Sequence, residues 1–199
     1  MASVIYNNIP FDPSDLSNVE TNFILGQFMT AWSQTESLCG FLFRELSQIS
    51  YEIANTIFDR IGTREQIEIL TEFVDLIPDP ERKGRGTSAL KEVEDISKAR
   101  NKIVHAGWGL FNGEHARFWH GITSARFSEI CQESPRGKAD RTRFIFTISD
   151  IAALIARSVA VREQLETLLH EIGRERFHAR RAQDVDRWLS HPGRDPIQR

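Results

Sequence analysis

Apolar residues recur at intervals of three, four and seven along much of the chain, a spacing that places them on one face of an α-helix. The longest such pattern runs from about residue 18 to residue 47, where Ser17 or Asn18 is a suitable N-terminal cap. Its members are Phe28, Trp32, Cys39, Phe43 and Leu46, widened by Leu25, Leu38 and Leu42. We expect a long helix whose aromatic face lies in the core.

Two shorter patterns follow this first helix. One predicts a helix over residues 51–60, and the other predicts a helix over 63–77, where Thr63 and Gln66 have the spacing of a capping box. The residues expected to face inward are Ile53, Ile57 and Phe58 in the first of these helices, and Ile67, Leu70, Phe73, Val74 and Ile77 in the second.

The segment from Pro78 to Gly86 contains prolines, glycines and basic residues, and it is expected to be a loop. A fourth helix should begin at Thr87 or Ser88 and end before Gly107, because glycine is favoured just after a helix. Its apolar stripe consists of Leu90, Val93, Ile96, Ala99, Ile103 and Val104.

The pattern changes over residues 108–147. Two short apolar runs flank Asn112-Gly113, a dipeptide typical of a β-hairpin turn. A basic loop is expected over 134–143, and the run Arg143–Ile148 is a candidate third strand.

A last long helix should open at Ser149 or Asp150 and run to Gly173. Its stripe consists of Ile151, Leu154, Ile155, Val159, Arg162, Leu165, Leu168, Leu169 and Ile172. Together these elements predict a mainly α fold, a bundle of four to five helices. A small β-hairpin or three-strand excursion lies between the fourth helix and the last one.

We expect a single helical domain over residues 18–173, with the excursion at 108–147. An extended arm over 1–17 precedes the domain, and an Arg-rich extension over 174–199 follows it. A chain of 199 residues, 40% of them hydrophobic, is long enough to bury one core.

Composition narrows the location and the class of partner. The formal net charge is −3, so no global field attracts nucleic acid, and contact with RNA would need a local basic patch. The two cysteines, Cys39 and Cys131, do not make a disulfide framework. The N-terminal residues do not resemble a secretory signal, and no apolar run is long enough to span a bilayer, so we expect a cytoplasmic protein.

The most informative polar residues lie near the end of the fourth predicted helix. Asn101 and His105 are four residues apart and share a face, whereas Arg100 and His105 are separated by about 140° around the helix. A long arginine side chain can bridge that angle, or it can act across a two-fold axis on a partner's histidine. No metal-binding pattern of histidines, Walker-type phosphate loop or Ser/His/Asp set is present, and we expect no cofactor.

Arginine, histidine and an amide suit cleavage of an RNA phosphodiester by its own 2′-hydroxyl. Histidine can move protons near neutral pH, and a guanidinium matches a phosphate with two parallel hydrogen bonds. A structural interpretation stands beside this one, because the dipole at a helix C-terminus favours basic residues there and Asn101 could bond a neighbouring backbone group.

The segment from Arg100 to His105, Arg-Asn-Lys-Ile-Val-His, resembles the motif of the HEPN family (higher eukaryotes and prokaryotes nucleotide-binding domains). That motif is an arginine, four to six residues and a histidine, often with a polar residue after the arginine. The context is similar to a bacterial branch of the family: Trp32 and Glu36 lie four apart on an early helix, and Trp108 follows the motif.

This resemblance implies a helical bundle that forms a homodimer, with a cleft made by both protomers. Many members of the family are metal-independent endoribonucleases in toxin–antitoxin or phage-defence systems, whereas others have lost activity and act as interaction domains. The resemblance implies that Arg100 and His105 are catalytic and that Asn101 supports them. It also implies an RNA substrate and an antitoxin or another defence protein as a partner.

Three further sets of residues are candidates for lesser roles. Glu36 is expected to be structural or to orient Arg100, and Trp108 is expected to be a packing lid or a platform for a base. The basic clusters that could receive RNA phosphates are Arg82, Lys83 and Arg85; Arg136, Lys138, Arg141 and Arg143; and Arg174, Arg176, Arg180 and Arg181.

Two other functions fit the same residues. One is a catalytically inactive HEPN-fold module that mediates interactions, and the other is a helical bundle that binds a nucleotide by gripping its phosphate with Arg100 and His105.

Overall fold

A computed structural model describes residues 4–6, 9–11, 19–132 and 135–190 of the chain. The elements in this part are β1 (Val4–Tyr6), β2 (Ile9–Phe11), α1 (Val19–Ser47), α2 (Tyr51–Phe58), α3 (Thr63–Asp75), α4 (Pro80–Val104), β3 (Gly107–Phe111), β4 (Glu114–Phe118), α5 (Ser124–Cys131), α6 (Pro135–Phe144), β5 (Ile145–Thr147) and α7 (Ile148–Ser190). The fold is mainly helical, as expected, with a small antiparallel sheet between α4 and α7.

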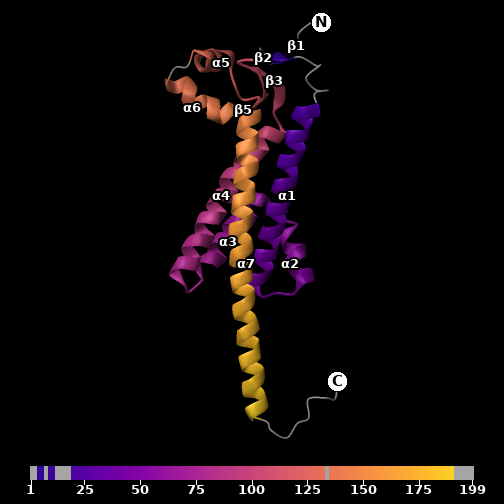
Figure 1. Cartoon of the computed structure of the whole chain (residues 1–199), viewed down its shortest axis with the longest axis vertical. Coiled ribbons are helices and arrows are strands. Elements are labelled where there is room, and N and C mark those ends of the chain that lie inside the picture. The colour runs from indigo at the N-terminus through magenta and orange to yellow at the C-terminus, as the bar shows by residue number, and fades with distance from the viewer. Residues whose placement is uncertain (1–3, 7–8, 12–18, 133–134, 191–199) are drawn as a thin grey trace.

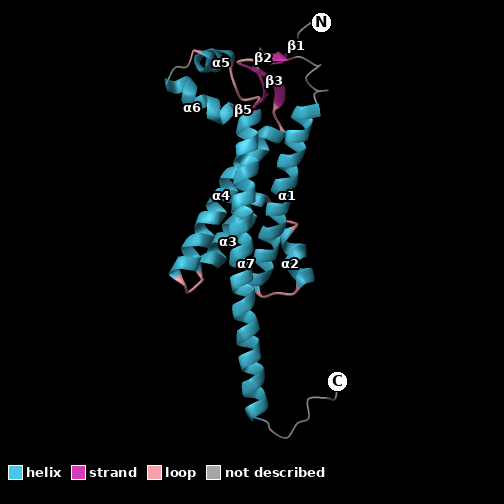
Figure 2. Ribbon diagram, viewed as in Figure 1, coloured by secondary structure: helices cyan, strands magenta, loops and turns pink. Residues whose placement is uncertain are grey.

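The long helices α1, α4 and α7 form the body of the molecule (Figure 1). Helix α7 packs along both α1 and α4, and α3 packs on α1 and α4. The sheet lies at one end of this bundle together with α5 and α6, and α7 extends well beyond the bundle at the other end (Figure 2). None of the described helices has the length and apolarity needed to cross a bilayer.

The periodic stripes account for most of the core. Phe28, Trp32, Leu42 and Phe43 of α1 are buried as expected. They pack in one cluster with residues of the other helices, among them Leu70, Val74, Leu90, Val93, Ile96, Ile151, Leu165 and Leu168. The spacings of three and four residues predicted these buried positions correctly, because burial of one apolar face of each helix is what stabilises a bundle.

The stripe expected for α2 is wrong in part. Ile53 and Ile57 are 54% and 42% exposed, whereas Ala54 and Phe58 are buried. The ring of Phe58 packs 5.2 Å from the ring of Phe43, centroid to centroid, and this contact turns the ridge of Ala54 and Phe58 toward the core. The isoleucine ridge lies about 100° away around the helix and therefore faces outward.

The capping box expected at Thr63 and Gln66 is also absent from the structure. Gly62 is the residue before the helix, Gln66 Nε2 donates a hydrogen bond to the carbonyl oxygen of Phe58 (2.7 Å), and Thr63 Oγ1 donates to Glu36. Both side chains connect α3 to preceding helices instead of to its own first turn.

Most of the loop expected from Pro78 to Gly86 is instead the first part of α4, which begins at Pro80, so that only Pro78 and Asp79 of this segment lie outside a helix. Asp79 caps this helix by accepting hydrogen bonds from the backbone N–H groups of Glu81 and Arg82, and proline is compatible with the first helical turn. A Cβ on Gly86 would lie 2.8 Å from Val74 Cγ1, so this glycine permits close approach of α4 to α3 rather than breaking the helix.

The hairpin and the third strand are confirmed. Asn112 and Gly113 have positive φ values of 52° and 82°, as a type I′ turn requires, and β5 pairs antiparallel with β4. Directly paired residues share a face, so Trp108, Arg117 and Phe146 form one row across the sheet.

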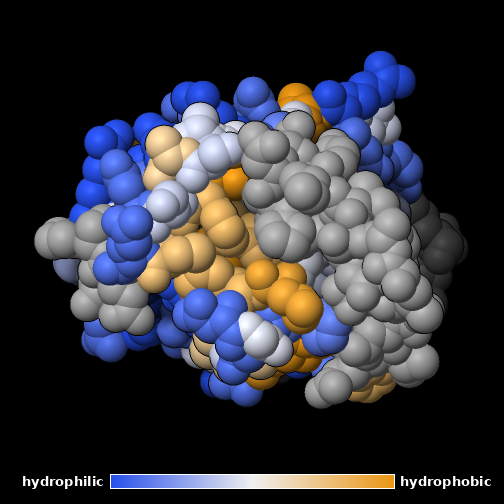
Figure 3. Space-filling view, turned by 90° about the horizontal axis from the view of Figure 1, so that it is seen from above, coloured by the Kyte–Doolittle hydropathy of each residue, from blue (hydrophilic) through white to orange (hydrophobic). Residues whose placement is uncertain are grey.

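The two faces of this sheet belong to different cores. Trp108 and Phe146 join the cluster of the helical bundle, whereas Phe118 and Ile145 belong to a second cluster that includes Ile130 of α5 and Phe144 of α6. Seen from the end that carries the sheet, the surface has an apolar area bordered by polar residues (Figure 3).

The excursion contains more helix than the sequence suggested. The basic loop expected over 134–143 is wrong, because residues 135–144 form α6, and α5 was not foreseen. These two short helices cover the outer face of the sheet. Their own apolar patterns are weak, and the apolar contacts that they make with the sheet stabilise them instead.

The end predicted for the last helix at Gly173 is wrong as well. Helix α7 continues through Gly173 to Ser190, since one interior glycine costs a helix only about 1 kcal/mol and no proline follows before residue 191. At its other end, the backbone N–H of Asp150 donates to Thr147 Oγ1, and Asp150 Oδ2 accepts from the N–H of Thr147.

The predicted arm over 1–17 contains the short antiparallel pair of strands β1 and β2, and the caps proposed at Ser17 and Asn18 lie outside the described residues.

Candidate functional site

The Arg-Asn-His residues lie at the end of α4 that meets the sheet. Ile96 and Ile103 of α4 are completely buried and fix the orientation of the helix on the bundle. Asn101 and His105 are exposed, and Arg100 is partly buried. His105 is the residue directly after the helix, with φ −93° and ψ 4°, and its N–H donates to the carbonyl oxygen of Asn101 at 3.4 Å.

Arg100 has hydrogen-bonding capacity that its surroundings do not use. Its Nη1 donates to Oδ1 of Asn101 (3.0 Å), whereas its Nε is buried without a hydrogen-bond partner in the described part of the chain. No carboxylate there forms an ion pair with this guanidinium. A partly desolvated cation of this kind is suited to an anion such as a phosphate.

Two further cations lie near this end of α4. Burial, and to a lesser extent the positive charge of Arg143, lowers the pKa of Lys102 below its ordinary value. Arg143 has a 65% exposed side chain, and its ion pair with Asp140 is long, at 4.0 Å. Arg143 was a sequence candidate, but Lys102 was overlooked although it lies within the motif.

The residue that sequence reasoning missed entirely is Arg117 of β4, which is 7% exposed. Its Nε donates to the carbonyl oxygen of Ile103 (2.9 Å), and its Nη2 donates to that of Val104 (3.1 Å). These are the last two residues of α4. Burial lowers the pKa of Arg117 to about 10, so the side chain remains charged at neutral pH.

Trp108 lies against this arginine. Its side chain is 4% exposed, and the guanidinium carbon of Arg117 lies 4.9 Å from the centroid of its ring. Of the two roles considered for Trp108, this burial favours packing over stacking on a base.

Glu36 lies at the junction of α1 and α3. Its Oε1 accepts a hydrogen bond from Thr63 Oγ1 (3.3 Å), so the contact that the structure gives this carboxylate is with α3 rather than with Arg100. Glu36 also borders a polar groove of about 430 Å³ that includes Asn55 and Asp59. The geometry favours the structural role for Glu36.

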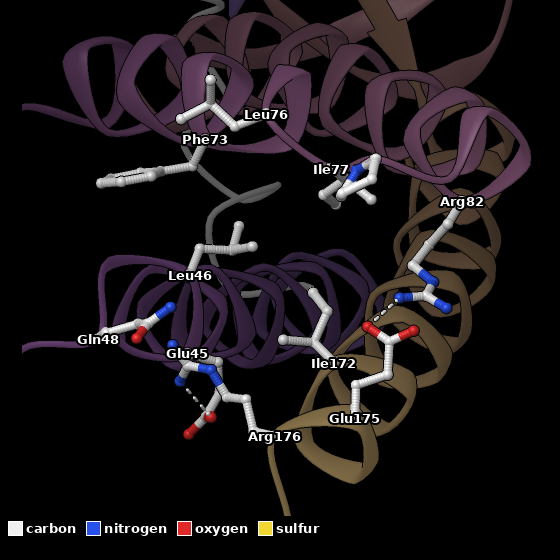
Figure 4. Close-up of a pocket in the computed structure, with 11 residues that line it drawn as sticks. Glu45, Leu46, Gln48, Phe73, Leu76, Ile77, Arg82, Ile172, Glu175 and Arg176 are labelled. Atoms are coloured by element: carbon white, nitrogen blue, oxygen red, sulfur yellow. Dashed lines mark hydrogen bonds and ion pairs between the residues drawn. The ribbon is translucent and has the colours of Figure 1, made fainter. Parts of the chain in front are cut away.

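The cluster of Arg82, Lys83 and Arg85 lies at the opposite end of α4, where Arg82 borders another groove. Arg82 is 2.6 Å from Glu175, Arg85 is 2.6 Å from Glu171, and Lys83 is 3.1 Å from Asp75. Figure 4 shows the groove, of about 350 Å³, with the Arg82–Glu175 ion pair across one side and the apolar side chains of Leu46, Phe73, Ile77 and Ile172. These cations are balanced by carboxylates, which makes them poor candidates for RNA contacts.

Arg141, another of the sequence candidates, is also paired, as are Arg136 with Glu129 and Arg176 with Glu45. Its Nη2 lies 3.0 Å from Oδ2 of Asp150, near the start of α7. Within the described residues, no three His, Cys, Asp or Glu side chains form a group that could hold a metal ion. Arg100 and Lys102, at the C-terminal end of α4, and Arg143 have no close carboxylate partner in the described part of the chain, and the same holds for Arg60, Lys91, Arg117 and Arg174.

Comparison with known proteins assigns no family. No family model, no curated protein and no solved structure matches this chain. The function of the site is therefore argued from its own residues.

Proposed function

We propose that this chain is a metal-independent endoribonuclease of the HEPN type, with Arg100 and His105 as its catalytic residues. The observation that carries the proposal is that two suitable side chains lie at the same helix end. Arg100 is partly buried and its Nε has no hydrogen-bond partner, and His105 is exposed. The order of residues from Arg100 to His105, which resembles the family motif, supports the same conclusion.

The reaction requires a proton-transfer group, a cation and water, and this end of α4 supplies the first two. The 2′-hydroxyl oxygen of a ribose attacks the adjacent phosphorus, the bond from phosphorus to the 5′-oxygen breaks, and the products carry a 2′,3′-cyclic phosphate and a 5′-hydroxyl. His105 moves one of the two protons, either taking it from the 2′-hydroxyl or giving it to the leaving 5′-oxygen, and water moves the other. Arg100 stabilises the negative charge that develops on the non-bridging phosphate oxygens, and Asn101 accepts a hydrogen bond from Nη1 of Arg100.

The RNA backbone would approach along the positive side of this helix end. Lys102 and Arg143 are placed to contact phosphates next to the scissile one, and each neutralised phosphate contributes affinity through release of counterions. An acidic protein can therefore bind RNA through a local patch.

A homodimer is part of the proposal. The angle of about 140° between Arg100 and His105 on one helix suits a cleft in which each arginine acts with the histidine of the other copy. Sedimentation at micromolar concentration should give about twice the chain mass of 22.8 kDa. A monomer at that concentration contradicts the shared cleft.

Two alternatives remain, both with the same residues. Basic groups at a helix C-terminus are favoured by the dipole, so Arg100 and His105 could bind a phosphate without cleaving RNA. The chain would then be a nucleotide-binding or interaction module, for example with an antitoxin or another defence protein as its partner.

The test is to incubate the chain with a mixed-sequence RNA in the presence of EDTA and to analyse the ends that form. Cleavage that persists with chelator and leaves 2′,3′-cyclic phosphates supports the proposal. Cleavage that requires added magnesium contradicts it, and binding of mononucleotides without cleavage favours the module.

A further inference from the structure

The centre of the small sheet holds a charged residue where an apolar one is the usual choice. Arg117 lies on the middle strand, between Trp108 of β3 and Phe146 of β5. Both neighbours belong to the core of the helical bundle, and Arg117 itself is 7% exposed. Burial of a charge is costly unless hydrogen bonds and opposite charge compensate it.

The compensation comes from the end of α4. Two nitrogens of the guanidinium donate to the carbonyl oxygens of Ile103 and Val104, which are among the carbonyls that an α-helix leaves unsatisfied at its C-terminus. The negative end of the helix dipole acts as the counter-charge, and the face of Trp108 packs on the guanidinium. In the described residues, no carboxylate forms an ion pair with Arg117.

One of these two bonds acts directly on the motif. The carbonyl of Val104 and the N–H of His105 belong to the same planar peptide group. The hydrogen bond from Arg117 Nη2 to this carbonyl therefore fixes the orientation of the peptide plane that precedes the Cα of His105. The N–H of His105 makes only a long bond to Asn101, at 3.4 Å. Arg117 is therefore the stronger of the two restraints on this peptide.

We propose that Arg117 is a positioning residue that holds His105 in its working orientation, and that the β excursion is the part of the fold that supplies this restraint. The inference rests on the proposed function, in which His105 moves the proton. It gives a role to the segment 108–147, which holds Arg117 and its two aromatic neighbours.

The competing account is that Arg117 only stabilises the packing of the sheet on the bundle. Two variants separate the accounts. Arg117→Met keeps an unbranched side chain over Trp108 and removes both hydrogen bonds, whereas Arg117→Lys keeps the charge and can reach one carbonyl. Arg126→Met is the matched control, because Arg126 also lies over an aromatic ring (Phe144, 5.5 Å) and contacts the buried Asp140, and both of these partners belong to α6 rather than to α4.

The primary measurement is the NMR signal of the His105 imidazole, assigned by its loss in His105→Ala. It does not depend on ribonuclease activity, so it distinguishes failure of this inference from failure of the proposed function. In wild type and in Arg126→Met we expect one sharp His105 signal. In Arg117→Met we expect a shifted and broadened signal, with an intermediate signal in Arg117→Lys.

The second measurement is the rate of RNA cleavage at saturating RNA. Misplacement of a reacting group by about 1 Å can cost 10²-fold, so kcat should fall by about that factor in Arg117→Met while KM stays unchanged. Arg117→Lys should recover part of kcat, and Arg126→Met should keep it even if its melting temperature falls equally.

Clear results would overturn the inference. A folded Arg117→Met variant with the wild-type His105 signal shows that Arg117 does not position the histidine. If neither Arg117 variant folds, exchange of the guanidinium Nη2 protons of wild-type Arg117, which donate to Val104, decides: slow exchange supports the restraint, and exchange at the rate of a free arginine overturns it.

Discussion

Arg85 Nη2 lies 2.6 Å from Glu171 Oε2 and thereby joins α4 to α7 across 86 positions of the chain. The pair explains why a cluster of basic residues is not equivalent to a nucleic-acid site. Arg82 and Arg85 form ion pairs with Glu81, Glu171 and Glu175. Their positive charges are therefore balanced within the protein, where they connect α4 to α7.

This relationship predicts different effects for the basic residues at the two ends of α4. The double substitution Lys102→Ala with Arg143→Ala should weaken RNA binding and reduce the slope of log affinity against log salt by about 0.7 for each lost phosphate contact. Arg85→Ala should leave that slope unchanged and lower the free energy of unfolding by about 1 kcal/mol or less, since its pair is largely exposed. Salt titrations of fluorescent RNA with the three proteins provide the comparison. A smaller slope in Arg85→Ala alone would reverse the assignment of the patch.

The unforeseen first turns of α4 predict opposite effects for two nearby glycines. A Cβ on Gly84 meets nothing within 4 Å, whereas one on Gly86 would lie 2.8 Å from Val74 Cγ1 and 3.2 Å from Leu168 Cδ2. Gly84→Ala should raise the free energy of unfolding by about 0.5–1 kcal/mol through helix propensity, and Gly86→Ala should lower it by about 1–3 kcal/mol through overpacking. Urea unfolding of both variants measures this. Two variants of equal stability would contradict a helix that packs at this point.

Cys39 predicts a pH dependence of stability. Burial, with the charge of Glu36 as a lesser cause, raises the pKa of this thiol from 9.0 to about 12. Above pH 9 the unfolded chain loses the thiol proton while the folded chain keeps it, so stability is retained below pH 9 and lost as the pH rises toward 12.

The contribution of Cys39 should reach about 1.4 kcal/mol for each pH unit well above pH 9. Other groups titrate in this range, so the informative quantity is the difference between wild type and Cys39→Ala in urea unfolding at pH 8 and pH 10. The gap in unfolding free energy between the two proteins should shift in favour of the variant at the higher pH. A gap that is the same at both values would mean that the thiol ionises in the folded chain.

The sequence was most informative where local chemistry determines structure. Phe28 and Trp32 are buried on one face of a helix, and their spacing forms a continuous apolar stripe only in a helix. Asn112 and Gly113 both have positive φ values, a backbone conformation that few other residue pairs adopt at low energetic cost. It was least informative where a tertiary contact decides. Gly86 read as a helix breaker, but it lies where α4 approaches Val74.

The candidate site shows the same division. The spacing of Arg100, Asn101 and His105 placed them on the end of one helix, as the structure has them. The role of Arg117 depends on β4 pairing with β3 and folding back on α4, which no local pattern reveals. The available signal was a single arginine inside the apolar run of a predicted strand.

The most direct test of the account compares His105→Ala with a control, His120→Ala, in RNA cleavage and thermal unfolding on the same preparations. His120 is an exposed histidine of the β excursion. His105→Ala should fold, because loss of a favourable dipole contact costs only about 0.3–1 kcal/mol. Its cleavage rate should fall by about 10²–10⁴-fold, the usual contribution of acid–base catalysis, while His120→Ala cleaves like wild type. A folded His105→Ala protein that cuts RNA at the wild-type rate would contradict the catalytic role of this helix end.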